Sequence, residues 1–302
     1  DCRLSPLHAA LADKGAVFTQ TFGWERPQWF SLDGREEECS YRRNNVFDVV
    51  RAECEAVRNR VGVIDMTGFA KYDVRGAGAE AFLNRLLANR MPKRDGGMAL
   101  AHFLSRQGRI LGEATVTRIA NDPFYLLSAA SAELRDFDHL LQQREEGEAV
   151  EITNATEQRG VMVVAGPRSR ELLATLTDAP LDNASFPWRS AQEIELAGVK
   201  TLALRINYVG ELGWELHPRM ADLETLYAAV WAAGEAHGIA NFGLYALNSL
   251  RMEKAYRGWG AELTNEVTML EADMARFFNG KKEGFIGKLA TETRDTGPLQ
   301  LV

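Results

Sequence analysis

The feature that most constrains the fold of this chain is an alternation of paired strands with single helices. Two apolar runs over 99–105 and 110–119 flank the polar tetrapeptide Arg106-Gln-Gly-Arg109, which predicts a β-hairpin with Gly108 in its turn. A short strand, a helix over 132–145 and another strand come next along the chain. Strands that pair as hairpins before a lone helix are typical of split βαβ units rather than of a doubly wound parallel sheet. The pattern therefore predicts the α+β class.

The same order of elements recurs further along the chain. Residues 160–166 predict a buried strand, Pro167 suits the first turn of a helix that ends near Leu176, and a hairpin and a helix over 222–237 follow. Two such units predict a weak twofold internal similarity. Further helices are expected where the apolar period of a helix continues, over 45–60, 242–256 and 270–278.

A glycine-rich turn near residue 210 sets two functional candidates, Tyr208 and Glu215, at its two ends. Apolar residues alternate with polar or small ones and predict a strand that runs into Tyr208, and the return strand begins at Trp214. Glycines within the turn supply the backbone angles of a tight connection. Such a turn can direct both side chains into one pocket. A core hairpin with a solvated carboxylate is the alternative on this segment alone.

Composition and charge exclude several classes of function. Hydrophobic content of 46% and charged content of 25% are the values of an ordinary soluble globular protein. No apolar run approaches the roughly 18 residues that a membrane span needs. The net charge of −7 argues against a broad nucleic-acid surface, although it leaves room for a local basic pocket. We therefore expect no membrane and no nucleic-acid partner.

Cysteine and histidine positions predict neither a metal site nor a covalent nucleophile. The three cysteines, Cys2, Cys39 and Cys54, are too few and too irregularly spaced for a disulfide framework or a zinc site. They fit free thiols in a reducing compartment, so we expect a cytoplasmic protein, or one of the mitochondrial matrix in a eukaryote. The five histidines show no metal-ligand spacing.

The segment from Phe22 to Phe30 concentrates aromatic residues around a glycine and a proline. We interpret it as a docking segment rather than a regular element. Either it folds onto its own domain as a surface arm, or it forms a seam against a preceding domain, and the residues alone leave both open. Because the chain begins at Asp1 and stops at Val302 on what resembles the start of a strand, we expect a fragment of a longer protein.

Motifs in a fixed order over roughly residues 45 to 290 resemble the aminomethyltransferase of the glycine cleavage system. The motifs are Val164-Ala-Gly-Pro, Arg205-Ile-Asn-Tyr-Val-Gly-Glu-Leu-Gly-Trp-Glu-Leu, Leu250-Arg-Met-Glu-Lys and Gly284-Phe-Ile-Gly-Lys. A closer resemblance is to the folate-binding C-terminal half of dimethylglycine and sarcosine dehydrogenases. It rests on Phe22-Gly-Trp-Glu-Arg-Pro and Asn241-Phe-Gly-Leu-Tyr-Ala-Leu-Asn-Ser-Leu-Arg-Met-Glu-Lys-Ala. No single motif is unique, and the ordered set is quite specific.

This resemblance implies a tetrahydrofolate-binding domain of ferredoxin-like split βαβ units in an aminomethyltransferase-type fold. The expected domains are an N-terminal docking or linker segment over 1–44, a folate-binding domain of two α+β subdomains over 45–290, and the start of a truncated C-terminal barrel over 291–302. The resemblance also implies a preceding flavin domain, with FAD, that oxidises an N-methyl amine. The present chain would then capture the one-carbon unit as methylene-tetrahydrofolate.

The resemblance further assigns roles to individual residues. Tyr208 and Glu215 match positions that contact the pterin, where a carboxylate accepts two hydrogen bonds from the aminopyrimidinone edge. Glu113 matches a catalytic carboxylate that is Asp in the aminomethyltransferase. Its extra methylene preserves charge stabilisation but makes close proton-transfer geometry doubtful. Arg251 is retained as a folate-binding residue, although pairing with Glu253 would give it a purely structural role.

Departures from the aminomethyltransferase pattern leave other functions open. Leu100, Ala129 and Leu247 replace a Tyr, an Asn and an Arg of the family, so the pocket is expected to bind folate differently. One alternative is a standalone aminomethyltransferase or folate-dependent demethylase, against which the docking segment argues. The other is a binding or scaffolding module with no chemistry of its own. The amine substrate is chosen outside this chain in the dehydrogenase interpretation.

Overall fold

The chain forms two compact units, and neither unit is continuous in sequence. The first comprises residues 1–68 and 157–256, and the second comprises residues 69–156 and 257–302. The structure is a computed structural model that describes residues 2–119 and 123–293. Among these residues, no helix is long and apolar enough to cross a membrane. The chain therefore leaves the first unit after residue 68 and returns to it at residue 157.

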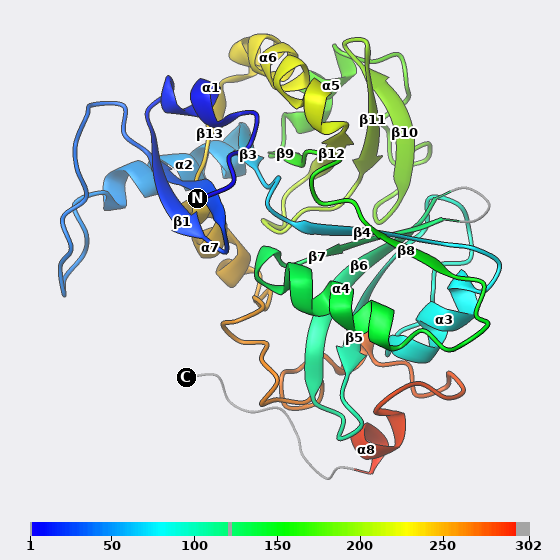
Figure 1. The fold of residues 1–302 in the computed structure, drawn as a ribbon. Coiled ribbons are helices and arrows are strands. Elements are labelled where there is room, and N and C mark those ends of the chain that lie inside the picture. The colour runs from blue at the N-terminus through cyan, green and yellow to red at the C-terminus, as the bar shows by residue number, and fades with distance from the viewer. Residues whose placement is uncertain (1, 120–122, 294–302) are drawn as a thin grey trace. The chain divides into compact units, whose positions relative to one another are not determined.

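A five-stranded antiparallel sheet forms the second unit (Figure 1). Its spatial order is β5-β6-β7-β4-β8, with strands β4 (Ala70–Arg75), β5 (Met98–Leu104), β6 (Ile110–Arg118), β7 (Phe124–Ser128) and β8 (Glu151–Asn154). Because β4 lies antiparallel to both β7 and β8, those two strands are parallel to each other and are joined through helix α4 (Glu133–Gln142). This is a split βαβ unit, as predicted.

One face of this sheet carries the core of the second unit. Helix α3 (Ala79–Leu86) contributes Phe82, Leu83 and Leu86 to that core, and α4 contributes Leu140. They pack against alternate residues of the strands, among them Ala114 and Val116 of β6. Since side chains alternate between the faces of a strand, Glu113 lies on the opposite face of the sheet. The 3₁₀ turn Ala275–Phe277 and helix α8 (Lys288–Glu292) follow towards the end of the described chain.

A six-stranded mixed sheet forms the first unit, in the order β10-β11-β12-β9-β3-β13. Its strands are β3 (Val61–Asp65), β9 (Met162–Ala165), β10 (Ala191–Leu196), β11 (Val199–Leu204), β12 (Gly213–Pro218) and β13 (Ile239–Asn241). Its helices are α1 (His8–Ala12), α2 (Phe47–Asn59), α5 (Ser169–Ala174), α6 (Leu223–Gly234) and α7 (Leu244–Glu253). Strands β1 (Ala16–Thr21) and β2 (Trp24–Phe30) form a separate hairpin.

The predicted internal similarity is present in the topology. The succession β9-α5-β10-β11-β12-α6-β13 repeats β4-α3-β5-β6-β7-α4-β8, and each set places its second, third, fourth and first strands side by side in that order. The repeats differ at one point, because β3 inserts between β9 and β13 in the first unit, whereas β4 pairs directly with β8 in the second. The α+β prediction is therefore confirmed together with its repeat.

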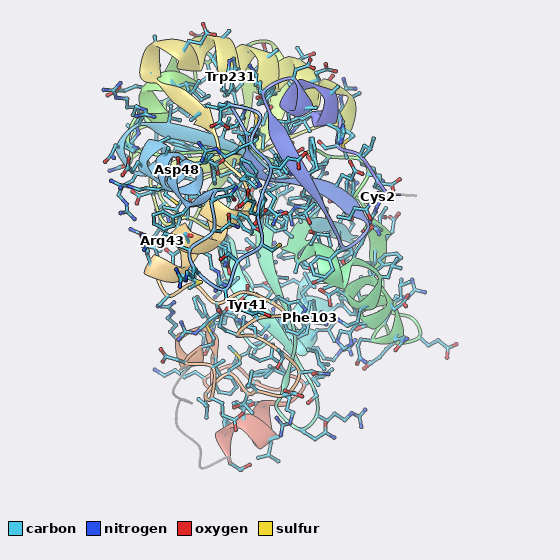
Figure 2. All side chains as sticks on the ribbon, turned by 90° about the vertical axis from the view of Figure 1, so that its left-hand side faces the viewer. Cys2, Tyr41, Arg43, Asp48, Phe103 and Trp231 are labelled. Carbon is cyan, nitrogen blue, oxygen red and sulfur yellow. The ribbon has the colours of Figure 1, made fainter. Side chains whose placement is uncertain are left out.

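Helices cover both faces of the six-stranded sheet. On one face, α5 and α6 pack over a core that includes Val164, Trp214 and Leu216 (Figure 1). Figure 2 labels Trp231 on α6, whose ring receives the Lys14 Nζ at 3.8 Å from its centroid. On the other face, α2 approaches β3 so closely that a Cβ on Gly62 would lie 2.5 Å from Val57.

Two predicted segments have different structures. The aromatic segment over 22–30 is regular strand β2 for most of its length, and Trp24, Trp29 and Phe30 are buried in the first unit. The helix expected over 270–278 is wrong, because only the short 3₁₀ turn forms there, preceded by the left-handed residue Asp273 (φ 56°). The expected start of a barrel over 291–302 lies largely outside the described residues.

Candidate functional site

The loop over 205–212 holds Tyr208 in the first unit, between β11 and β12. Its conformation is fixed by Asn207, whose Oδ1 accepts hydrogen bonds from the backbone nitrogens of Val209 (3.1 Å) and Gly210 (3.0 Å). The Asn207 Nδ2 donates to the carbonyl of Glu211 at 2.9 Å. Gly210 has φ 72°, a conformation that favours glycine. The strand therefore ends before Tyr208, which lies in this Asn-braced bend and not at a strand end as expected.

Tyr208 stacks on Tyr256, with ring centroids 6.1 Å apart and an interplanar angle of 23°. Tyr256 follows the end of α7, where Ala255 adopts a left-handed φ of 54° and the Tyr256 nitrogen donates to the Arg251 carbonyl at 3.0 Å. A left-handed alanine costs roughly 1–2 kcal/mol. The strained helix end thus sets the position of the aromatic ring against which Tyr208 lies.

Arg251 is buried and stabilises this helix end. Its Nε donates to Asn248 Oδ1 at 2.8 Å, and its Nη1 donates to the carbonyl of Tyr256 at 2.9 Å. Glu253, which the sequence offered as an alternative partner of Arg251, pairs with Arg58 of α2. The structure therefore connects Arg251 to Tyr208 through Tyr256, and these contacts give Arg251 a positioning role.

Glu215 occupies β12, where it pairs with Leu204 on one side and Val163 on the other. Val163 pairs in turn with Ile64, so the carboxyl group shares its sheet face with buried aliphatic side chains. Glu215 is 6% exposed, and its Oε2 has no hydrogen-bond partner among the residues that the structure describes. Burial raises the pKa of this carboxyl to about 8. The alternative of a solvated glutamate is thus wrong.

A buried carboxyl group with an unused oxygen is suited to a ligand that offers N–H donors. Unpaired buried carboxylates are costly, and donors supplied by a ligand relieve that cost. His217 lies two residues along the same strand face, and its Nε2 is 3.6 Å from Glu215 Oε2. This distance exceeds a hydrogen bond, so the histidine leaves that oxygen available.

Glu113 belongs to the second unit and forms a pair with His102. The two residues are opposite each other in the β5–β6 ladder, and His102 Nε2 lies 2.9 Å from Glu113 Oε2. The His102 side chain is fully buried, whereas that of Glu113 is 21% exposed. Because an ionised carboxylate only accepts hydrogen bonds, Nε2 carries the proton in this contact. His102 thereby orients a carboxylate that a ligand can reach.

Comparison with known proteins identifies the family of the chain. A family model described as the GCVT N-terminal domain matches residues 7–282. The chain belongs to this family. Mitochondrial dimethylglycine dehydrogenase of Mus musculus is 37% identical over 302 residues, which cover 99% of this GCVT chain and 34% of that protein. Mitochondrial sarcosine dehydrogenase of Homo sapiens is 30% identical over 341 residues, covering 99% and 37% respectively.

Structural comparison supports the same fold. The glycine cleavage system aminomethyltransferase T of Bartonella henselae superposes with a TM-score of 0.83 at 23% identity, covering 99% of this chain and 76% of that one. The predicted resemblance and the aminomethyltransferase-type fold are therefore confirmed. The GCVT chain spans about a third of the length of the dehydrogenases that it matches. It is an aminomethyltransferase-like domain related to dimethylglycine and sarcosine dehydrogenases.

Two residues of the GCVT chain escaped the sequence analysis although they contact predicted site residues. His102 could have been found as the residue facing Glu113 across the predicted hairpin, since the turn at Gly108 fixes the register. Tyr256 gave no comparable signal, because its position depends on the left-handed Ala255. Within the described residues, no group of three or more His, Cys, Asp or Glu could hold a metal ion.

Proposed function

We propose that this GCVT chain is a tetrahydrofolate-dependent one-carbon acceptor in a dimethylglycine or sarcosine dehydrogenase-like protein. The product would be methylene-tetrahydrofolate, formed from an iminium or formaldehyde-level product of N-methyl amine oxidation. The observation that carries the proposal is Glu215, a buried carboxyl with an unused oxygen on a sheet of the family fold. The dimethylglycine dehydrogenase of Mus musculus and the sarcosine dehydrogenase of Homo sapiens are both named as mitochondrial. This favours a location in the mitochondrial matrix if the source is eukaryotic, and in the cytoplasm otherwise.

Each site residue has a distinct role in the proposal. Glu215 accepts two hydrogen bonds from the N–H donors of the aminopyrimidinone, and Tyr208 packs against the pterin ring. Arg251 holds the helix end that positions Tyr208 through Tyr256. Tetrahydrofolate supplies the nucleophilic nitrogens that accept the carbon. Glu113, oriented by His102, stabilises the positive charge of the incoming group and is the catalytic residue.

The partner implied by this role is a flavin domain of the same protein. The dehydrogenases matched here are about three times as long as this chain, so the length needed for a further domain is present in the relatives. FAD would belong to that domain, and the choice of amine substrate would be made there. The present chain would act on the iminium or formaldehyde that the flavin domain releases. In the iminium case, the amine would leave as the folate nitrogens take the carbon, and in the formaldehyde case water would leave.

Calorimetric titration with tetrahydrofolate tests the binding role of Glu215. Because burial holds the Glu215 pKa near 8, the carboxyl is mostly protonated at pH 7. A ligand that donates two hydrogen bonds to it should release about one proton, which buffers of different ionisation enthalpy reveal. Glu215→Gln should weaken binding roughly tenfold or more and abolish the proton release. The matched control Glu193→Gln, at an exposed position of β10, should behave like the parent.

The catalytic role of Glu113 separates an enzyme from a binding module. Supplied with formaldehyde and tetrahydrofolate, the parent should form methylene-tetrahydrofolate faster than the uncatalysed mixture. Glu113→Gln should lower the rate by roughly a hundredfold while leaving tetrahydrofolate affinity within about threefold. An unchanged rate would make the chain a folate-binding module without chemistry of its own. Activity of the isolated chain with an aminomethyl donor would instead favour a standalone aminomethyltransferase.

A further inference from the structure

Arg26, on strand β2 of the first unit, is a cation that forms no salt bridge with a carboxylate of the described residues. Its Nη2 donates to the thioether sulfur of Met66 at 3.0 Å, and this is the hydrogen bond that the described residues provide to its guanidinium. A thioether is a weak acceptor. The Nε is buried and has no hydrogen-bond partner within the described range. The guanidinium therefore has several donors to offer, and the described residues give it one weak acceptor.

The nearest carboxylate does not neutralise Arg26. Asp65, at the end of β3, favours the charged guanidinium electrostatically, yet it forms no ion pair with Arg26 within 4 Å among the described residues. Its Oδ1 accepts from the backbone nitrogen of Thr67 at 2.9 Å instead. Burial lowers the pKa of Arg26 from its usual range, but an arginine remains charged in proteins. A half-buried guanidinium whose Nε is buried without an acceptor among the described residues is costly unless a ligand completes it.

A second unused donor lies on the same side of β2. Trp24 and Arg26 are two residues apart in a regular part of the strand, so their side chains project from one face. The indole Nε1 of Trp24 is buried and has no acceptor within the described residues. Gly68 borders the indole, because a Cβ there would lie 3.2 Å from Trp24 Cγ. Met66 and Gly68 thus bring the chain leaving β3 against both donors.

We propose that Arg26 and Trp24 form a binding site for a carboxylate group. One guanidinium offers a single positive charge and paired N–H donors, and the indole adds one neutral donor. This set matches a carboxylate, with one charge and two oxygens, better than a phosphate dianion, which usually takes more than one cation. The segment containing these residues was interpreted from the sequence as a docking segment, and the structure gives two of its residues a ligand-binding role.

The site lies within reach of Glu215 along one sheet face. Glu215 pairs with Val163, which pairs with Ile64, and Met66 follows Ile64 on the same face. Two strand spacings and two residues of β-rise separate the Glu215 and Met66 Cα atoms by about 12 Å. An extended ligand with a pterin at one end and a glutamate at the other spans that order of distance. The tail carboxylate of the ligand proposed for Glu215 is thus one source, and a separate carboxylic acid is the other.

Tetrahydrofolate and tetrahydropterin, which lacks the glutamate tail, distinguish the two sources when titrated into the full chain. Arg26→Met should weaken tetrahydrofolate binding roughly ten- to a hundredfold and leave tetrahydropterin binding unchanged if the tail occupies the site. If a separate acid occupies it, glutarate should raise the melting temperature of the parent and not of Arg26→Met, with tetrahydrofolate affinity unaltered. Arg51→Met makes the same charge change on an exposed part of α2 and should alter neither response.

The inference is wrong if neither tetrahydrofolate affinity nor the glutarate response depends on Arg26. Trp24→Phe, which keeps the ring and removes the N–H donor, should reduce the same response a few-fold and decides the question if Arg26→Met does not fold. The tail assignment rests on the proposed function, whose failure has a different signature. In that case, tetrahydropterin would not bind the parent, or Glu215→Gln would bind it as well as the parent does, whereas the glutarate response would still report on Arg26.

Discussion

At the scale of single residues, the ionisation of Glu215 should make folding stability depend on pH. Its folded pKa of about 8 lies above the ordinary value of 4.5, so between these values the folded chain keeps a proton that the unfolded chain has lost. The stability contribution is fully present below pH 4.5 and is lost as the pH rises through 8, with a slope of up to about 1.4 kcal/mol per pH unit. Glu215→Gln removes this slope. Urea unfolding at pH 5, 6, 7 and 8 measures it.

The comparison of parent and variant isolates Glu215 from other titrating groups. A glutamine that fits poorly would change the free energy of unfolding by an amount independent of pH, whereas the loss of an ionisable group changes its slope. The stability of Glu215→Gln relative to the parent should therefore rise steadily from pH 5 to pH 8. A constant difference over this range would mean that Glu215 titrates as it does in water, and hence that its burial is not retained in solution.

The His102–Glu113 contact predicts that the rate falls when His102 is replaced by an apolar residue and is largely retained when it is replaced by glutamine. His102→Leu removes the donor that orients the Glu113 carboxylate and should slow methylene-tetrahydrofolate formation roughly ten- to a hundredfold. His102→Gln can place an amide N–H near the position of Nε2 and should retain most of the rate. Initial rates with formaldehyde and tetrahydrofolate, at several pH values, provide the measurement. Equal loss in both variants with a lowered melting temperature would indicate a structural role only.

At the scale of elements, Glu53 of α2 connects two segments far apart in sequence. Its carboxylate oxygens accept from the backbone nitrogens of Phe30, at the end of β2 (2.8 Å), and Gly243, at the start of α7 (2.9 Å). Glu53→Ala leaves two buried N–H donors unpaired and should cost about 2–5 kcal/mol in the free energy of unfolding. Glu55→Ala, on the exposed side of α2, should cost less than about 0.5 kcal/mol. Urea unfolding at pH 8, above the Glu53 pKa of about 7, tests both.

The same scale shows what sequence periodicity could and could not predict. The hairpin of β5 and β6 and the helix α6 followed from apolar spacing and glycine placement, because their own residues determine them. The expected helix over 270–278 failed, although it is apolar, since Thr268 and Asp273 organise that segment through local side-chain contacts and a left-handed turn. Strand β2 was missed because its aromatic residues are buried by elements distant in sequence. Periodicity cannot reveal such contacts.

In the candidate site, too, the sequence predicted some features and not others. Tyr208 and Glu215 were predicted as a pair because one turn contains both, whereas no pattern in the sequence predicted the burial of Glu215. The sequence left open whether Arg251 binds folate or pairs with Glu253. In the structure Glu253 pairs with Arg58, and Arg251 donates to the Tyr256 carbonyl. Arg26 lies in the docking segment and in the motif Phe22-Gly-Trp-Glu-Arg-Pro, but neither assigned it a role of its own. Its unusual environment arises from the approach of Met66 across the fold of the first unit.

At the scale of the whole molecule, the division into two units indicates that residues 1–44 are part of the folded first unit. Leu7, Leu11 and Phe30 are buried in the same core as Trp214 of β12, and Phe30 also supplies one of the donors that Glu53 binds. A linker or docking arm would contribute little to such a core. The boundary expected near residue 45 therefore separates sequence segments that the contacts of the first unit keep together.

Deletion of residues 1–44 tests this organisation. Burying an aliphatic or aromatic side chain is worth about 1.5–3 kcal/mol, so losing Leu7, Leu11 and Phe30 should remove most of the roughly 5–15 kcal/mol that stabilises a typical domain. The chain over 45–302 should therefore be poorly folded. It should lose its near-UV circular dichroism signal and increase the fluorescence of a hydrophobic dye. Leu7→Ala alone should cost about 2–5 kcal/mol, whereas Leu32→Ala, at a site 87% exposed, should cost almost nothing. If 45–302 instead unfolded cooperatively with the parent's midpoint, residues 1–44 would be the detachable linker that the sequence indicated, and the buried contacts of this segment would contribute no net stability.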